Sequence, residues 1–172
     1  MDGFIRLVAT LSRVAGVAAA GMIVLSVVVV CQMVFARYVL GQSTVWQTPL
    51  VTYMLVASTF LGSPYVLLLK GHVNVDLIPI YLGHRGRVTL ALFASAVSFA
   101  FCAVVLWKGL GFWYEAWEAG WTAASAWRLP LWIPYLSLPL GMALLCLQYL
   151  ADVLSVLSGR DMPFGLKPED RA

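Results

Sequence analysis

The chain has 172 residues, of which 62% are hydrophobic and only 11% are charged, and its mean hydropathy is +0.88. A soluble domain is closer to half apolar and a quarter charged, so this composition excludes an ordinary soluble fold and indicates one integral membrane domain. The formal net charge of +3 comes from residues scattered among the connections between apolar runs, which leaves no basic cluster for binding nucleic acid.

The first apolar run covers about residues 14–36, which is long enough to cross the roughly 30 Å apolar core of a bilayer as a helix. Before it, residues 2–12 combine apolar and basic side chains, and we expect them to form a short interfacial helix. The run is longer than the apolar region of a signal peptide, so we expect it to be retained. Gln32 is its most polar side chain and should hydrogen-bond to a neighbouring helix. The run ends at Arg37 and Tyr38, which suit the headgroup level.

The second apolar run covers about residues 50–69. Trp46 and Pro49 lie at its start, and proline is well tolerated in the first turn of a helix. Pro64 lies deeper in the run and predicts a kink, because it lacks the N–H that would bond to the preceding turn. The connection at residues 70–81 is unusually apolar for a loop. We expect it to lie along the membrane surface or against a partner.

The third apolar run covers about residues 88–107 and carries small residues at helical spacing, which allow helices to approach closely in lipid. Beyond it, Trp113, Trp117 and Trp121 are four residues apart and share one helix face. This pattern predicts an amphipathic continuation on the outer membrane surface. Its aromatic face fits a lipid belt, a carbohydrate platform or a docking surface, and the lipid belt is the preferred interpretation.

The fourth apolar run covers about residues 131–151, and three prolines near its start predict a bent or tilted outer end. Residues 159–172 contain prolines and several charges, which is typical of a flexible tail. The sequence therefore predicts an all-α integral membrane protein. We expect a four-helix transmembrane domain at residues 1–158 and a cytoplasmic tail at residues 159–172.

The distribution of basic residues predicts the orientation of the four spans. The two tails and the connection between the second and third runs hold eight of the eleven Lys and Arg residues, and the other two connections hold three. Cytoplasmic segments carry the excess of Lys and Arg in membrane proteins. We therefore expect both termini and the middle connection to be cytoplasmic.

No apolar run carries a charge near its middle, whereas proton and ion pathways usually place ionisable groups at that depth. The three cysteines form no Cys-x-x-Cys pair, and His72 and His84 lie in one connection rather than inside spans. The sequence shows no phosphate-binding loop, metal-ligand spacing or Ser-His-acid arrangement. We therefore expect no enzyme activity, no cofactor and no bound metal, and a protein that supports transport or assembly.

Several short motifs occur in a fixed order, and their key residues are Arg37, Tyr38, Trp46, Gly62, His72, Asn74, Asp76 and Trp132. Their order and spacing resemble the small membrane subunit, DctQ-like, of tripartite ATP-independent periplasmic (TRAP) transporters. The resemblance covers about residues 5–155. One departure is that the family usually has a glutamate shortly after the tryptophan, whereas here Trp46 is followed by Gln47-Thr48-Pro49-Leu50.

The resemblance implies a multi-pass subunit of the bacterial inner membrane, surrounded by membrane lipids. It implies a scaffold that packs beside a large, elevator-type permease subunit, DctM-like, which takes up an organic acid in an ion-driven process. A soluble periplasmic binding protein would deliver the organic acid. By resemblance, Arg37, Tyr38 and Trp46 would fix the outer edge of the scaffold. The Gly-His-x-x-Val-Asp signature after the second span would organise the cytoplasmic loop against the large subunit.

Two other classes of protein fit part of this pattern. An autonomous small multidrug-type carrier would also have four spans, but such carriers usually need an acidic residue inside a span, and none is present. A membrane anchor of a redox complex would need histidines inside the spans to hold haem. Both histidines lie outside the spans, so the scaffold interpretation is preferred.

Overall fold

The computed structural model describes residues 2–69, 84–125 and 127–157. The helices in these ranges are α1 (Asp2–Tyr38), α2 (Gln47–Leu68), α4 (His84–Glu118), α5 (Trp132–Tyr135) and α6 (Ser137–Leu157). Four of them, α1, α2, α4 and α6, are long and apolar enough to cross a membrane. Within the described ranges the β-structure consists of one isolated bridge, between Thr122 and Pro130. The predicted all-α class with four spanning helices is confirmed.

The structure differs from the prediction at the N-terminus. Residues 2–12 are the first turns of α1, which runs without interruption for 37 residues and is about 55 Å long at the usual rise per residue. Val8 and Ser12 are fully buried, and the Ser12 hydroxyl bonds to Gln148 on α6. A separate interfacial helix was therefore the wrong expectation, because this face of the segment packs on protein.

Two further expectations concern the outer ends of the helices. The predicted helical continuation beyond Trp107 is confirmed as far as Glu118, the last residue of α4, a continuous helix of 35 residues, whereas Trp121 lies beyond its end. The predicted bend at the start of the fourth span is confirmed. The helix is interrupted at Leu136, which separates the short α5 from α6, and prolines lie on both sides of the break.

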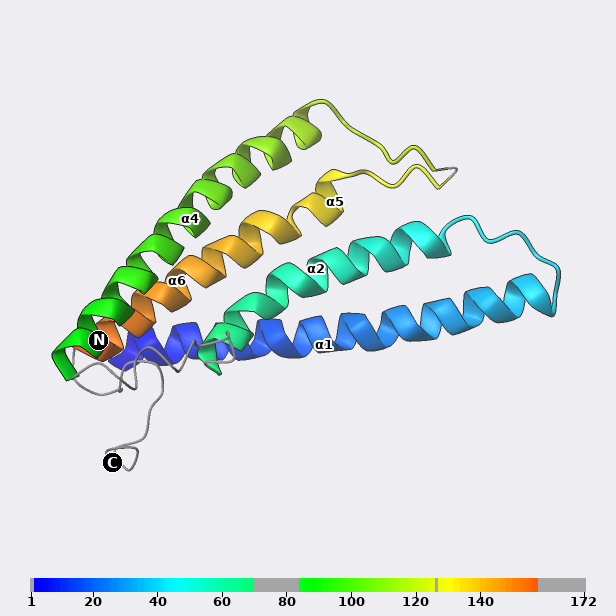
Figure 1. The fold of residues 1–172 in the computed structure, drawn as a ribbon. Coiled ribbons are helices and arrows are strands. Elements are labelled where there is room, and N and C mark those ends of the chain that lie inside the picture. Colours follow the sequence, from blue (N-terminus) through cyan, green and yellow to red (C-terminus); the bar gives the residue numbers. More distant parts are fainter. Residues whose placement is uncertain (1, 70–83, 126, 158–172) are drawn as a thin grey trace.

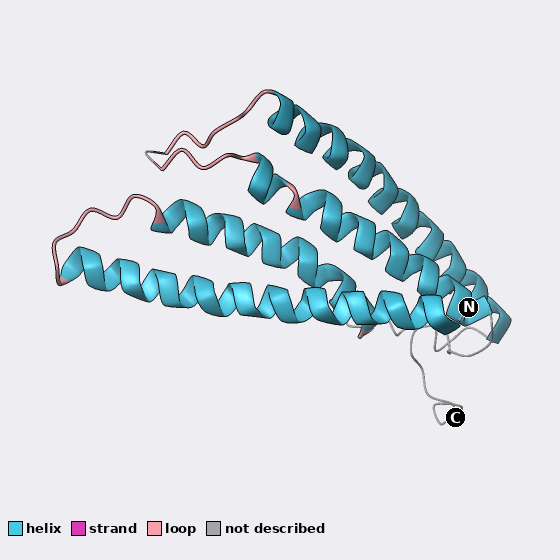
Figure 2. Ribbon diagram, turned by 180° about the vertical axis from the view of Figure 1, so that it is seen from behind, coloured by secondary structure: helices cyan, strands magenta, loops and turns pink. Residues whose placement is uncertain are grey.

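The helices lie side by side as a fan over most of their length, and α1 crosses α2 and α6 near one end (Figure 1). Across the fan the order is α4, α6, α2 and α1, and α1 and α4 are its two edges (Figures 1 and 2). The helices converge at the end that holds the N-terminus and diverge toward the opposite end. In the most apolar stretch of the span Trp132–Ser155, which contains α5 and most of α6, 39% of residues are buried, against 11–17% in the other three spans. This inner span is therefore the most covered part of the fan.

A small core joins three helices near the converging end. Its buried members are Leu67 on α2, Cys102 on α4, and Leu145 and Cys146 on α6. Partly buried side chains of α4 and α6, among them Tyr149, pack around this core. All three cysteines of the chain are free thiols.

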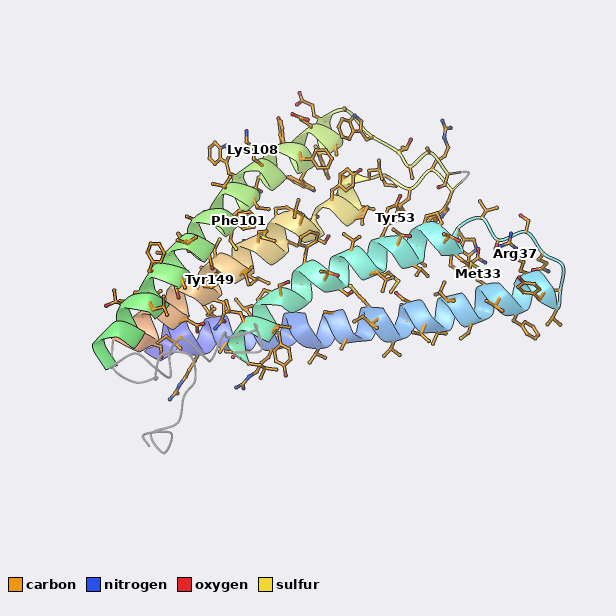
Figure 3. All side chains as sticks on the ribbon, viewed as in Figure 1. Met33, Arg37, Tyr53, Phe101, Lys108 and Tyr149 are labelled. Carbon is orange, nitrogen blue, oxygen red and sulfur yellow. The ribbon has the colours of Figure 1, made fainter. Side chains whose placement is uncertain are left out.

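Many large apolar side chains of the fan are exposed. Along α4 an exposed stripe repeats every three or four residues and consists of Phe93, Val97, Phe101, Val104 and Trp107. Figure 3 shows Phe101 and Lys108 along this helix. An exposed apolar stripe of this length is expected to face lipid or another membrane protein. The change from Trp107 to Lys108 is typical of a membrane–water interface.

Candidate functional site

The described residues contain no group of three or more His, Cys, Asp or Glu side chains that could hold a metal ion. The middle parts of the spanning helices also carry no Asp, Glu, Lys or Arg. The features that remain are surfaces and contacts between helices. The candidate site is therefore a set of packing and docking positions, and it has three parts.

The first part lies at the diverging end of the fan, where α1 ends and α2 begins. We call it the outer rim, after the predicted orientation of the chain. Arg37 and Tyr38 form the last turn of α1, and Tyr38 is 82% exposed. The chain turns back at Gly41, which has a φ of 60°, a conformation that glycine adopts without strain. Trp46 precedes α2 and makes no side-chain hydrogen bond to cap it. All three predicted residues of this edge are thus exposed at one end of the α1–α2 pair.

A hairpin between α4 and α5 reaches this rim. We use the term outer hairpin for residues 119–125 and 127–131. Its arms pair through backbone hydrogen bonds from Ala123 to Leu129, at 2.9 Å, and from Leu131 to Trp121, at 2.8 Å. The ring of Trp127 lies 6.4 Å from the ring of Trp46. The two outer connections of the chain therefore meet through a pair of tryptophans.

The second part is an aromatic cluster that joins the outer end of α4 to α5. The indole N–H of Trp113 donates to the backbone carbonyl of Trp132, at 3.1 Å. The Trp117 ring lies edge-on to the Trp132 ring at 4.7 Å and contacts Trp113 at 5.9 Å. Trp117 is still 52% exposed. These tryptophans therefore pack against one another within the chain. The interpretations drawn from the sequence had included only an exposed aromatic face.

Phe112 extends this aromatic cluster toward the base of the outer hairpin. Its ring contacts that of Tyr135 at 4.8 Å and that of Trp121 at 5.8 Å. Aromatic pairs at such separations stabilise a structure beyond the apolar area that they bury. The cluster therefore fastens α4 to α5 at the outer end of the fan.

The third part is a series of close helix crossings at glycines. A Cβ atom on Gly16 would overlap the ring of Tyr65 where α1 crosses α2. A Cβ on Gly141 would overlap the carbonyl oxygen of Phe60 where α6 crosses α2. Gly62, which the sequence analysis singled out, is less constrained. A Cβ there would lie 3.5 Å from the Cβ of Ala19, which is ordinary van der Waals contact.

Polar side chains link α1 to its neighbours at two levels. Near the rim, the Gln47 amide donates to the Gln32 carbonyl oxygen at 3.4 Å, which confirms that Gln32 bonds to a neighbouring helix. Near the converging end, the Ser12 hydroxyl donates to Gln148 at 2.9 Å, and the Gln148 amide donates to Asp152 at 3.3 Å. Buried polar groups in a membrane protein need such partners, because lipid supplies none.

The predicted residues that the structure describes therefore do not form a single site. The structure brings Trp46 to the outer hairpin and Trp132 into the aromatic cluster, and it places Gly62 in the α1–α2 crossing, apart from both. His72, Asn74 and Asp76 lie outside the described residues.

The most constrained positions are Gly16, Gly141, Ser12 and Gln148, and no close contact was predicted at any of them. Some of these positions left a signal in the sequence. Ser12, Gly16 and Ala19 follow small-residue spacing on one face of α1, which is typical of a close crossing. Gln148 is a polar residue inside an otherwise apolar run.

Comparisons with known proteins point to one family. The family described as tripartite ATP-independent periplasmic transporters, DctQ component, matches residues 26–159. One relative is the C4-dicarboxylate TRAP transporter small permease protein DctQ of Vibrio cholerae serotype O1 (strain ATCC 39315 / El Tor Inaba N16961). It is 25% identical over 148 residues, which cover 74% of this chain and 64% of the relative.

The protein of the same description from Rhodobacter capsulatus is 26% identical over 110 residues, which cover 64% of this chain and 48% of the relative. The chain thus spans about half to two thirds of the length of these curated relatives. No solved structure matches it.

Proposed function

The chain belongs to the DctQ component family of tripartite ATP-independent periplasmic transporters, and on this premise we propose that it scaffolds a large, elevator-type permease subunit in the membrane. It is a small permease subunit of such a transporter, a multi-pass protein of the bacterial inner membrane, and not an enzyme. The family gives no support to an autonomous carrier or to a redox anchor.

The observation that carries the proposal is the exposure of the spanning helices. In the most apolar stretches of α1, α2 and α4 at most 17% of residues are buried, so much of their apolar surface lacks a partner within the chain. An isolated transport pathway would need an enclosed polar lining and ionisable groups at depth. An apolar set of helices without such groups is instead suited to pack beside a partner and enlarge its contact area with lipid. This chain would then stay fixed in the membrane while part of the partner moves.

The proposed partners follow from the family. We expect a large DctM-like permease subunit beside this chain and a soluble periplasmic binding protein on the outer side. Membrane lipids would cover the remaining apolar surface. The predicted motif residues would serve these contacts, with Arg37, Tyr38 and Trp46 at the outer edge and Trp132 holding the α4–α5 end in shape. His72, Asn74 and Asp76 are proposed for the cytoplasmic side on the resemblance alone.

The proposed substrate is an organic acid of the C4-dicarboxylate class, because both relatives are described as C4-dicarboxylate transporter subunits. The mid-span regions of this chain carry no basic side chain that could neutralise a carboxylate. Recognition of the substrate and of the driving ion would therefore lie on the partner chains.

An uptake experiment tests the function. Cells that lack this chain but keep the other transporter subunits should lose ion-dependent uptake of radiolabelled succinate, and the wild-type chain supplied on a plasmid should restore it. A parallel series with other organic acids separates the role of the chain from the identity of the substrate. Unchanged uptake of every transported acid after deletion would contradict the proposed function.

A further inference from the structure

The fan is held together in different ways at its two ends. At the converging end, α2, α4 and α6 share the core of Leu67, Cys102, Leu145 and Cys146. At the opposite end, α1 and α4 lie far apart (Figures 1 and 2). There the outer hairpin extends from α4 and α5 and brings Trp127 against Trp46, at the start of α2.

The outer hairpin has a defined backbone, although it joins two helices and lies at the periphery. Its arms are paired by the bonds described above, and its turn is closed by the Arg128 amide, which donates to the Ser125 carbonyl at 3.0 Å. Arg128 has a φ of 46°, and among the described residues it is the one non-glycine residue with a positive φ. A side chain at such a φ is strained.

Backbone strain of this kind persists where the surrounding structure holds it, and it often marks a functional position. Arg128 directly follows Trp127, so the strained turn carries the ring that contacts Trp46. The Trp127 side chain is 37% exposed and Trp46 is 41% exposed. Neither ring is buried in a core, so their mutual contact is a distinct feature of the outer rim.

We propose that the outer hairpin is a brace that fixes the distance between α2 and α4 on the outer side, through the contact of Trp127 with Trp46. The brace complements the core at the converging end, so that the fan is held at both ends and behaves as one rigid plate. This inference concerns the chain itself and does not depend on the proposed transport role. The other role for these two rings is to anchor each outer connection separately in the lipid interface.

Distance measurements between spin labels separate these two roles. In the full chain in lipid nanodiscs, with the exposed Cys31 replaced by Ala, an outer label pair at Leu55→Cys and Leu110→Cys reports the α2–α4 distance. An inner pair at Val66→Cys and Val97→Cys is the control. All four positions are more than 40% exposed. Cys102 and Cys146 are buried and remain unlabelled.

If the hairpin is a brace, Trp127→Ala lengthens and broadens the outer distance distribution and leaves the inner one unchanged. Trp46→Ala has the same effect, and the double variant adds nothing further, because either change removes the whole contact. Arg128→Gly keeps the narrow distribution, since glycine adopts the required φ without strain. Trp107→Ala, which removes an exposed tryptophan from α4 outside the brace, also leaves it narrow.

Three results would overturn the proposal. The first is an outer distribution that stays narrow in Trp127→Ala, which means that lipid or other contacts hold the helices. The second is a broadening of both label pairs, which means that the substitution loosens the whole bundle. The third is an additive effect of the two tryptophan substitutions, which means that each ring acts separately.

Discussion

The carbonyl oxygen of Phe60 on α2 faces the Cα of Gly141 on α6. A Cβ on Gly141 would overlap this oxygen, so the glycine hydrogen at that position points toward it. Pro64 lies four residues after Phe60 inside the same helix and has no N–H to bond to the Phe60 carbonyl. The proline and the close crossing are therefore two parts of one arrangement. A Cα–H of Gly141 approaches a carbonyl that lacks its usual helical partner, a weak but recurrent contact between packed helices.

Gly141→Ala should destabilise the chain by about 1–3 kcal/mol, because an added methyl group at a close crossing forces the helices apart. The measurement is thermal unfolding of the purified chain in detergent, followed by circular dichroism. Gly111→Ala is the matched control, since a Cβ on that helical glycine meets nothing within 4 Å. The control should be neutral or slightly stabilising, because alanine favours helix. Equal melting temperatures for the two variants would show that the crossing is looser than the structure indicates.

The buried hydrogen bond between Ser12 and Gln148 should contribute to the packing of α1 on α6. Ser12 is completely buried and Gln148 is 2% exposed, so Ser12→Ala leaves the Gln148 oxygen without this donor. We expect a loss of about 0.5–2 kcal/mol, the range measured for hydrogen bonds between helices in membranes. Thr10→Ala is the control, because its exposed hydroxyl bonds to the Arg6 carbonyl of its own helix.

A double-mutant cycle with Gln148→Leu isolates the interaction between the two side chains. If the cycle shows no coupling energy, the hydrogen bond does not hold α1 to α6.

Trp132→Ala should loosen the outer end of α4. The ring of Trp132 packs edge-on against Trp117 and is partly buried, so we expect a loss of about 1–3 kcal/mol, less than for a fully buried tryptophan. Tyr114→Ala, which removes an exposed aromatic side chain from α4, should have little effect. Proteolysis of the outer hairpin reports local opening directly. Similar cleavage rates in both variants would argue that the cluster faces lipid without fastening the helix.

The orientation of the chain can be tested by labelling single cysteines in intact cells with a membrane-impermeant maleimide. In a Cys31→Ala background, Gln42→Cys and Glu118→Cys should react from outside, because both lie at the diverging end of the fan. Gly3→Cys should react only after the membrane is permeabilised, as expected from the excess of basic residues on the cytoplasmic side. The reverse labelling pattern would contradict the assignment of a cytoplasmic N-terminus.

The spanning helices were predictable because the length of an apolar run decides whether it can cross a bilayer. The contacts between them were not, since they depend on which faces meet. Residues 2–12 suited an interfacial helix as well as a continuation of α1, and the packing of Ser12 on α6 decided between the two. The pairing of Trp46 with Trp127 joins loops that are far apart in sequence. Its geometry depends on helix order and tilt, which a pattern of hydrophobicity does not specify.

In the candidate site, too, individual residues were predictable from the sequence and their contacts were not. Trp132 was recognisable as part of a motif, but its contacts with Trp113 and Trp117 required the position of α5 beside α4. Gly62 stood out in the motif, whereas the tighter crossing belongs to Gly141. A glycine in an apolar helix signals a close approach, but the sequence does not reveal which neighbour approaches or how closely.

The measurement that tests the central claim most directly is affinity purification of the tagged full chain from its native membranes in mild detergent, followed by mass spectrometry. The scaffold account predicts that a large membrane protein with many spans co-purifies in a stoichiometric amount. It also predicts that this partner protects the exposed apolar faces of the fan from labelling. If the chain is recovered alone or only with copies of itself, the account is contradicted.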